Sequence, residues 1–175
     1  MIKLHVGCGP NYVPGWVNID ADKQYRADVY VDASKPLPYE TDSVDAVLNQ
    51  HFIEHLTLEE GMVFLKDCVR ILKPGGLIRI STPDLLWLVQ DYNKSTPGNL
   101  QAYWCTPNFA TRCEMLNFSM KSWQHKFTFD EEDLTHRLML AGFKNIVRRN
   151  NSTYAPVFEG VETGRPECLT LEAEK

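Results

Sequence analysis

The chain has 175 residues, of which 43% are hydrophobic and 23% are charged, and these proportions are typical of one globular domain. The net charge of -5 argues against a dedicated nucleic-acid binder, because such proteins normally carry a basic surface. The five cysteines have no C-x-x-C spacing, which argues against a disulfide framework or a zinc finger. Because the chain shows neither a secretory leader nor a run of about 18 apolar residues, we expect a cytoplasmic protein without membrane contact.

The first part of the chain alternates short, β-branched apolar runs with turns. Glycines stop the first run at Gly7-Cys8-Gly9, and the second and third runs each end in an aspartate, Asp20 and Asp32. This pattern is typical of short strands that end at turns. We predict strands at residues 2–6, 17–20, 28–32 and 44–49.

The segment after Thr57 has the clearest helical pattern. Thr57 and Glu60 form a T-x-x-E capping box, and apolar residues then recur on one stripe as far as Leu72. Lys73-Pro74-Gly75-Gly76 ends this helix. The later elements are predicted as a strand at 77–82, a short helix at 85–92, a helix near 130–141 that begins with a Thr128–Glu131 capping box and ends at Gly142, and strands at 143–149 and 167–173.

Residues 94–126 lose this periodicity but are rich in aromatic side chains. A long segment of this kind inside a compact domain is usually functional, and an aromatic-rich one is seldom disordered. We treat 94–126 as an insertion within a single domain spanning residues 1–175, either a satellite core or a lid.

Alternating strands and helices predict a parallel α/β sheet, in which ligands bind at the carboxyl ends of the strands. Residues that directly follow the predicted strands should therefore gather around one crevice. They are Gly7, Gly9, Asn11, Asp20, Asp32, Asn49, Gln50, His51 and Asp84.

The glycine turn after the first strand lets a ligand approach the backbone, because no Cβ intervenes. It is neither a P-loop nor a dinucleotide fingerprint, since no Gly-Lys-[Ser/Thr] follows and Tyr12 occupies the third glycine position. Asp20 is suited to accept both hydroxyls of a ribose, and Asp32 to accept from an adenine amino group. Each aspartate can alternatively serve as an ordinary turn residue.

His51-Phe52-Ile53-Glu54-His55 matches H-x-x-E-H, a zinc motif of one group of metallopeptidases. Against that interpretation, the segment directly follows a strand, and the main helix begins only near Thr57. The other interpretations are a salt bridge at a helix start, or two histidines at the mouth of the crevice. We expect no bound metal and keep a zinc hydrolase as an alternative function.

Five segments in this order resemble the small, type-11-like class I S-adenosylmethionine-dependent methyltransferases. They are Leu-His-Val-Gly-Cys-Gly-Pro (4–10), Val-Asn-Ile-Asp (17–20), Leu-Pro-Tyr-Glu-Thr-Asp-Ser-Val-Asp-Ala-Val (37–47), His-Phe-Ile-Glu-His-Leu (51–56) and Arg-Ile-Leu-Lys-Pro-Gly-Gly-Leu-Ile-Arg-Ile-Ser-Thr-Pro-Asp (70–84). No single motif is decisive, but their order is specific. The series covers about half of the chain.

The resemblance implies a Rossmann-like, seven-stranded, mostly parallel sheet whose seventh strand inserts antiparallel between the fifth and the sixth. It also implies S-adenosylmethionine as the cofactor. The implied cofactor-binding residues are Gly7, Cys8 and Gly9 at the methionine end, Asp20 at the ribose, Asp32 and Ala33 at the adenine, and Asn49, Gln50 and His51 at the sulfonium.

The chain departs from this family in its first crossover. Only residues 10–16, with two prolines, connect the first two strands, whereas a parallel crossover normally needs about a dozen residues. We predict a reduced loop in place of the helix, with Tyr12 or Trp16 covering the sheet face that the helix would cover. A subgroup of predicted methyltransferases linked to surface-polysaccharide synthesis resembles the chain in this respect.

The resulting functional hypothesis is methyl transfer from S-adenosylmethionine to a small-molecule or saccharide acceptor, at oxygen. A hydroxyl acceptor needs a base within hydrogen-bond reach. We select His51 and then His125 as catalytic candidates, ahead of Glu54, His55 and Asp84, because histidine titrates near neutral pH. A non-catalytic binding protein with the same fold is the main alternative, and the sequence does not indicate an oligomeric state.

Overall fold

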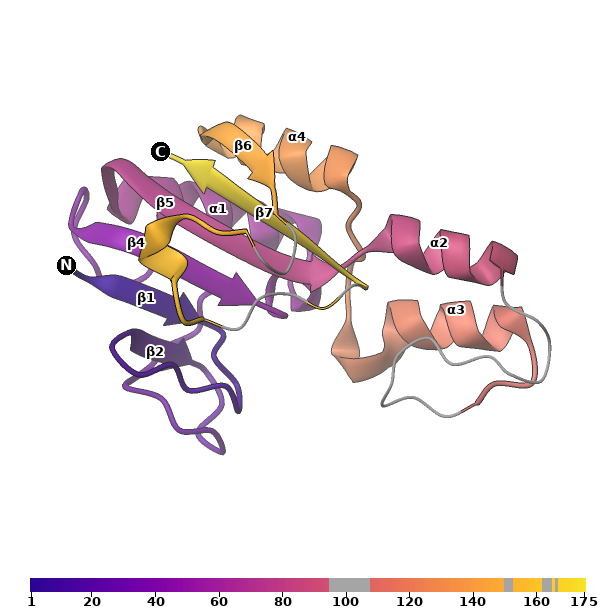
Figure 1. Cartoon of the computed structure of the whole chain (residues 1–175). Helices are drawn as coiled ribbons and strands as arrows, with labels where there is room; N and C mark the ends of the chain where they lie inside the picture. Colours follow the sequence, from indigo (N-terminus) through magenta and orange to yellow (C-terminus); the bar gives the residue numbers. More distant parts are fainter. Residues whose placement is uncertain (95–107, 150–152, 162–164, 166) are drawn as a thin grey trace.

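The computed structural model describes residues 1–94, 108–149, 153–161, 165 and 167–175 (Figure 1). Its centre is one seven-stranded sheet in the order β3-β2-β1-β4-β5-β7-β6. The first five strands in that order are mutually parallel, and β7 runs antiparallel to β5 and β6 on either side. This confirms the expected Rossmann-like sheet. The strands are β1 Lys3–Val6, β2 Val17–Asp20, β3 Val29–Tyr30, β4 Val44–Gln50, β5 Leu72–Pro83, β6 Lys144–Arg148 and β7 Cys168–Glu174.

Two of the predicted strands differ from the structure by more than one residue at an end. β3 is only Val29–Tyr30, because β2 ends at Asp20 and offers partners to just these two residues. β5 begins at Leu72, five residues earlier than predicted, because Leu72 pairs with Val44 before an irregularity in the register. The Lys-Pro-Gly-Gly segment therefore lies inside β5 rather than beyond the helix.

The described helices are α1 Leu58–Ile71, α2 Leu85–Lys94, α3 Arg112–Lys121 and α4 Glu131–Ala141. Helices α1 and α4 pack their apolar residues against one face of the sheet and form the main core with it. Helices α2 and α3 lie beside each other, beyond the carboxyl end of β5 (Figure 1). Within the described part of the chain, no helix combines the length and apolar character needed to cross a membrane.

The observed caps of α1 and α4 agree only in part with the capping residues predicted from the sequence. The Thr57–Glu60 capping box at α1 is confirmed, and so is Gly142 as the left-handed C-cap of α4. The predicted Thr128–Glu131 box is wrong, because Asp130 is the N-cap of α4 and accepts from the Asp133 N–H at 2.9 Å. Asp130, two residues after Thr128, thus accepts a hydrogen bond from a backbone N–H group that would otherwise be free at the start of α4.

Helix α3 lies within the segment for which no helix was predicted. Thr111 and Glu114 form a complete capping box at its start. Only Met115 and Ser119 of this helix are buried, so its sequence lacks the apolar stripe that reveals an amphipathic helix. The T-x-x-E spacing was the signal that could have found it. The aromatic stretch also includes residues 95–107, which lie outside the described residues.

The first crossover is a loop without a helix, as predicted, and the buried side chain of Asn18 holds it. Its Oδ1 accepts from the Val13 N–H at 2.8 Å, and its Nδ2 donates to the carbonyls of Val13 and Trp16, each at 3.0 Å. These bonds replace the backbone hydrogen bonds that a crossover helix would make for itself. The turn that leads out of β1 is thereby fixed without a helix.

The face of the sheet opposite α1 is covered by Trp16, as expected. Trp16 is buried and stacks on Phe158 of the short turn Pro156–Phe158, in a cluster that includes Leu48 of β4. Tyr12 does not join this cluster, because its hydroxyl donates to Asp28 at 2.9 Å. The prediction is therefore confirmed for Trp16 and wrong for Tyr12.

A buried ion pair completes this second face. Arg79 Nη1 lies 2.6 Å from Glu172 Oε1, and the two side chains stand on the neighbouring strands β5 and β7. They point away from the main core, because side chains alternate along a strand and Ile78 and Ile80 take the other face.

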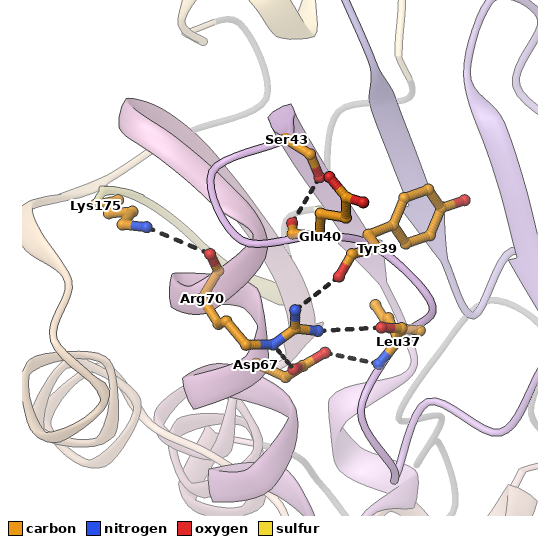
Figure 2. Close-up of polar contacts among 7 residues, drawn as sticks. All are labelled: Leu37, Tyr39, Glu40, Ser43, Asp67, Arg70 and Lys175. Carbon is orange, nitrogen blue, oxygen red and sulfur yellow. Dashed lines mark hydrogen bonds and ion pairs between the residues drawn. The ribbon is translucent and has the colours of Figure 1, made fainter.

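The loop that follows β3 is tied to α1 by a network centred on Arg70 (Figure 2). Its guanidinium donates to the carbonyl of Tyr39 at 2.6 Å, to the carbonyl of Leu37 at 3.0 Å and to the carboxylate of Asp67 at 2.6 Å. Asp67 in turn accepts from the Leu37 N–H at 2.7 Å. The network anchors the loop that begins at Asp32 and Ala33.

Candidate active site

The turn after β1 needs glycine at Gly7. Its φ is +69°, and a Cβ added there would come within 2.5 Å of the Phe52 side chain. Gly9 has a φ of +50°, but the space in front of it is open, since a Cβ there would meet no atom within 4 Å. The backbone at Gly9 is thus accessible to a ligand.

Asp20 connects the end of β2 with this turn. Its Oδ2 accepts from the Gly9 N–H at 2.7 Å, and its Oδ1 accepts from the Asp22 N–H at 2.8 Å. Each carboxylate oxygen retains capacity for a second hydrogen bond, so the pair can still accept from two hydroxyls. Between Gly7 and Gly9, the Cys8 side chain is buried, and burial together with the nearby Asp20 raises its thiol pKa to about 11.

Asp32 and Ala33 follow β3, where the resemblance places the adenine. Asp32 accepts from the hydroxyl of Ser34 at 2.6 Å and from its N–H at 3.0 Å, and these bonds lower its pKa. Its side chain is half exposed, whereas Ala33 is buried against the core. The segment after β3 therefore offers a partly exposed carboxylate, from Asp32, next to an apolar side chain, Ala33.

Asn49 at the end of β4 carries an unsatisfied acceptor. Its Nδ2 donates to the carbonyl of Val6 at 3.1 Å, but its Oδ1 is buried and has no hydrogen-bond partner within the described part of the chain. Buried polar atoms are rarely left in this state, so such an atom invites a donor from a ligand. Gln50 beside it is also buried.

His51 leaves β4 with a positive φ of 51° and contacts both Glu54 and Cys168. Its Nδ1 lies 3.1 Å from Glu54 Oε1, and its Nε2 lies 3.4 Å from Cys168 Sγ. Burial alone would lower the His51 pKa, but the hydrogen bonds to Cys168 and Glu54 outweigh it and raise the pKa to about 10. The contact with Cys168 in β7 was not foreseen, because nothing local in the sequence links positions so far apart.

Glu54 is fully buried in a single turn of 3-10 helix, Ile53–His55. Its Oε2 accepts from the Thr82 hydroxyl at 3.1 Å. Residues 51–55 do not form the α-helix that would place His51 and His55 together on one face. The geometry on which the zinc hydrolase alternative depends is therefore not present.

His125 comes to this site from the far end of the aromatic stretch. Its ring centroid lies 5.0 Å from that of His55 and 5.7 Å from that of Trp123. Burial lowers the pKa of His125, and its Nδ1 is buried without a hydrogen-bond partner among the residues that the structure describes. Sequence reasoning selected His125 but did not foresee its neighbour, His55.

A pocket of about 390 Å³ connects these groups. It extends from the turn after β1 to the ends of β4 and β5 and to the segment after α3. Its lining residues are Pro10, Asn11, His51, Glu54, His55, Pro83, Trp123, His125 and Arg165. The two catalytic candidates, His51 and His125, therefore border one space with Pro10 and Asn11, whereas Gly7, Cys8 and Gly9 are not among its lining residues.

Asp84, also a candidate base, is engaged elsewhere. It is buried, and its Oδ2 lies 2.8 Å from Arg148 Nη2, while its Oδ1 accepts from the Leu86 N–H at 2.9 Å. Asp84 is absent from the pocket lining. These bonds fix the start of α2 against β6.

Residues 4–80 match the family described as "Methyltransferase domain". A probable S-adenosylmethionine-dependent methyltransferase of Mycolicibacterium smegmatis is 39% identical over 59 residues, which are 34% of this chain and 22% of that protein. A ubiquinone biosynthesis O-methyltransferase of Parvibaculum lavamentivorans is 36% identical over 62 residues, 35% of this chain and 24% of that protein. The matched segment thus spans less than a quarter of either relative.

Among solved structures, a methyltransferase of Thermotoga maritima described as a possible histamine N-methyltransferase has a TM-score of 0.66 and 19% identity. The match covers 99% of this chain and 82% of that one. At this identity, the likeness establishes the fold alone. The match over residues 4–80 and the two relatives thus make this part of the chain similar to S-adenosylmethionine-dependent methyltransferases, and the solved structure shares the fold of the whole chain.

Proposed function

We propose that this chain transfers a methyl group from S-adenosylmethionine to a hydroxyl oxygen of a small-molecule or saccharide acceptor. The observation that carries the proposal is the pocket of about 390 Å³, which brings Pro10 and Asn11, directly after the glycine turn, together with His51, Glu54, His55 and His125. A cofactor on the turn and an acceptor among these ionisable groups would share that space.

The residues after the strands fit the cofactor by their chemistry. Asp20 has acceptor capacity for the ribose hydroxyls, and the buried Oδ1 of Asn49 can accept from the amino group of the methionine moiety. Asp32 and Ala33 would meet the adenine. Gly7, Cys8 and Gly9 would border the methionine, and Gln50 and His51 the sulfonium side.

Methyl transfer from a sulfonium is an in-line displacement, so the protein must chiefly hold the two partners in line. When bound, the cofactor supplies the activated methyl group. The acceptor hydroxyl also has to lose its proton, and His125, whose pKa burial lowers, is the proposed base. His51, whose pKa is raised to about 10, is protonated at neutral pH and would act beside it as a positively charged catalytic group. Trp123 and His125, from the described end of the aromatic stretch, would form the outer wall of the acceptor pocket.

The ionisable groups of the pocket wall support an oxygen target, because a hydroxyl acceptor needs a base that removes its proton. An amine acceptor that binds uncharged can attack the methyl group without prior loss of a proton. One matched relative is described as an O-methyltransferase. A non-catalytic binding protein with this fold is the second candidate, and the reduced first crossover favours it.

The test uses the full chain in two steps. Calorimetry with S-adenosylmethionine should show binding, and absence of binding at millimolar cofactor would overturn both candidates. With methyl-labelled cofactor and a set of simple glycosides and alcohols, NMR of the product should show an O-methyl signal. Binding without turnover on any acceptor would favour the non-catalytic candidate, and an N-methyl product would overturn the oxygen target.

A further inference from the structure

We propose that Glu54, His55 and His125 form a binding site for one divalent transition-metal ion at the wall of the acceptor pocket. One ligand atom from each of the three side chains lies within 4.8 Å of the other two. Ligand atoms of one metal ion with bonds of about 2.0–2.2 Å are roughly 3–3.5 Å apart, so small side-chain rotations would close the site. We had expected no metal, and the proposal departs from that expectation.

Backbone hydrogen bonds hold the two segments of the site together. The N–H groups of Lys126 and Phe127 both donate to the Glu54 carbonyl, at 2.8 Å and 3.2 Å. Lys126 also forms an ion pair with Glu60 at 2.9 Å, at the start of α1. His125 is therefore fixed beside Glu54 and His55 by bonds that do not depend on the three side chains.

Contacts with two neighbouring side chains orient the carboxylate of Glu54. His51 contacts its Oε1 at 3.1 Å, and Thr82 donates to its Oε2 at 3.1 Å. Each oxygen still has a free lone pair for a metal. Hydrogen-bonding groups that orient a ligating carboxylate in this way are a regular feature of metal sites. His51 and Thr82 thus act as positioning residues.

His125 supplies a second, independent observation. Its Nδ1 is buried and has no hydrogen-bond partner among the described residues. An imidazole nitrogen left in this state lacks the partner that buried polar atoms normally have. It borders a cluster that contains a fully buried carboxylate, and a bound cation would satisfy both groups.

The donor set defines the class of ion. Two imidazole nitrogens and one carboxylate oxygen suit Zn²⁺, Fe²⁺, Co²⁺ or Mn²⁺ better than Mg²⁺ or Ca²⁺, which prefer oxygen ligands. This set is not the one that H-x-x-E-H implies. In that motif His51 and His55 bind the metal and Glu54 acts as a base, whereas here Glu54 is a ligand and His125 replaces His51.

Three protein ligands leave coordination positions open toward the pocket. If the proposed methyl transfer is correct, an acceptor hydroxyl would take one of them, and the ion would lower the pKa of that hydroxyl. The hydroxyl proton passes to water, the oxygen forms a bond to the methyl carbon, and the carbon–sulfur bond breaks to release neutral S-adenosylhomocysteine. His125 then serves as a ligand rather than as a base.

The test is metal binding by the full chain, independent of turnover. Protein stripped with a chelator is titrated with Co²⁺, followed by its visible absorption, and with Zn²⁺, followed by calorimetry. We expect one ion per chain. His125→Ala and His55→Ala should each weaken binding at least ~100-fold, and Glu54→Gln should do the same; loss of the orienting contact in His51→Ala should weaken it about 10–100-fold.

The matched control is His136→Ala, because His136 is exposed on α4 and belongs neither to the group of three ligands nor to the lining of the acceptor pocket. This variant should bind Co²⁺ like the unmodified chain. Circular dichroism verifies that each variant is folded; if Glu54→Gln is not, the half-exposed His55 and His125 carry the test. Absence of Co²⁺ and Zn²⁺ binding, or binding that survives both histidine substitutions, would overturn the proposal.

S-adenosylmethionine binding by the stripped chain is measured in parallel. Cofactor binding without any metal binding would reject the metal site and leave methyl transfer standing. Metal binding without cofactor binding would support the site and reject methyl transfer. The two proposals therefore fail separately.

Discussion

The indole of Trp16 stacks on the ring of Phe158, with centroids 5.9 Å apart and planes inclined by 17°. The two residues come from opposite ends of the chain, and both are buried on the sheet face opposite α1. Trp16 belongs to the shortened first crossover. The pair therefore provides the apolar cover that a crossover helix would give, and it links the first crossover to the C-terminal part of the chain.

Replacing either ring should destabilise the fold. We expect Trp16→Ala and Phe158→Ala each to lower the free energy of unfolding by about 3–5 kcal/mol, because each leaves a cavity against Leu48 and Ala46. Urea denaturation followed by circular dichroism measures the loss. Tyr12→Phe, in the same loop but outside the cluster, should cost no more than about 1.5 kcal/mol for its one hydrogen bond. Equal losses for Tyr12→Phe and Trp16→Ala would contradict this assignment.

The glycines of the turn after β1 should respond differently to the same substitution. Gly7→Ala places a Cβ within 2.5 Å of Phe52, so we expect a loss of both stability and cofactor binding. Gly9→Ala meets no protein atom and should cost about 1–2 kcal/mol of backbone strain, and we expect its methyl group to obstruct a cofactor bound at this turn. Thermal unfolding and calorimetry with S-adenosylmethionine separate the two effects.

Gly15→Ala is the matched control for Gly9→Ala. Gly15 has a φ of +80°, and a Cβ there would also meet nothing within 4 Å. It should show a similar loss of stability but unchanged cofactor affinity. If Gly15→Ala weakens binding as much as Gly9→Ala, the effect of Gly9 comes from strain and not from contact with the cofactor.

The sequence was most informative where one segment determines its own structure. The capping box of α1, the glycine turn and the aspartate at the end of β2 are local patterns, and all were predicted at the right residues. The apolar stripe of α1 was only partly right, because Leu72 belongs to β5 and the buried face includes Phe64 and Ile71. The seven-strand order came from resemblance to a family, because no local pattern specifies which strands pair.

The contacts that sequence reasoning missed are long-range. His51 meets Cys168, and His55 meets His125, only because the sheet and the segment after α3 bring them together. Phe158 lies in an irregular stretch whose burial depends on Trp16, so neither partner could be inferred from its own neighbourhood. Helix α3 was missed because it buries little and therefore shows no stripe.

Two aspartates at the ends of strands should differ in their effect on cofactor binding. Asp20→Ala removes the acceptor proposed for the ribose hydroxyls and should weaken S-adenosylmethionine binding about 10–100-fold, the equivalent of roughly 1.5–3 kcal/mol for hydrogen bonds to a charged group. Asp84→Ala should leave the affinity unchanged and lower stability, because it breaks the contact with Arg148. Calorimetry and thermal unfolding on both variants provide the comparison. Unchanged affinity in Asp20→Ala would reject its ribose role.

The ion pair between Arg79 and Glu172 should behave as a buried pair, since both side chains are almost fully buried. Glu172→Ala leaves the guanidinium without its carboxylate, so we expect a loss of about 3–5 kcal/mol in the free energy of unfolding. The double variant Arg79→Met with Glu172→Met removes both charges and should recover most of that loss. Urea denaturation of the unmodified chain, Arg79→Met, Glu172→Met and the double variant gives the coupling free energy between the two positions. Glu172 also contacts Arg149 at 2.8 Å, and Arg149→Met alone should cost less than about 1 kcal/mol because that guanidinium is partly exposed. A double variant that is no more stable than Glu172→Ala would contradict this prediction. It would mean that the two polar side chains are required for the packing of this face of the sheet.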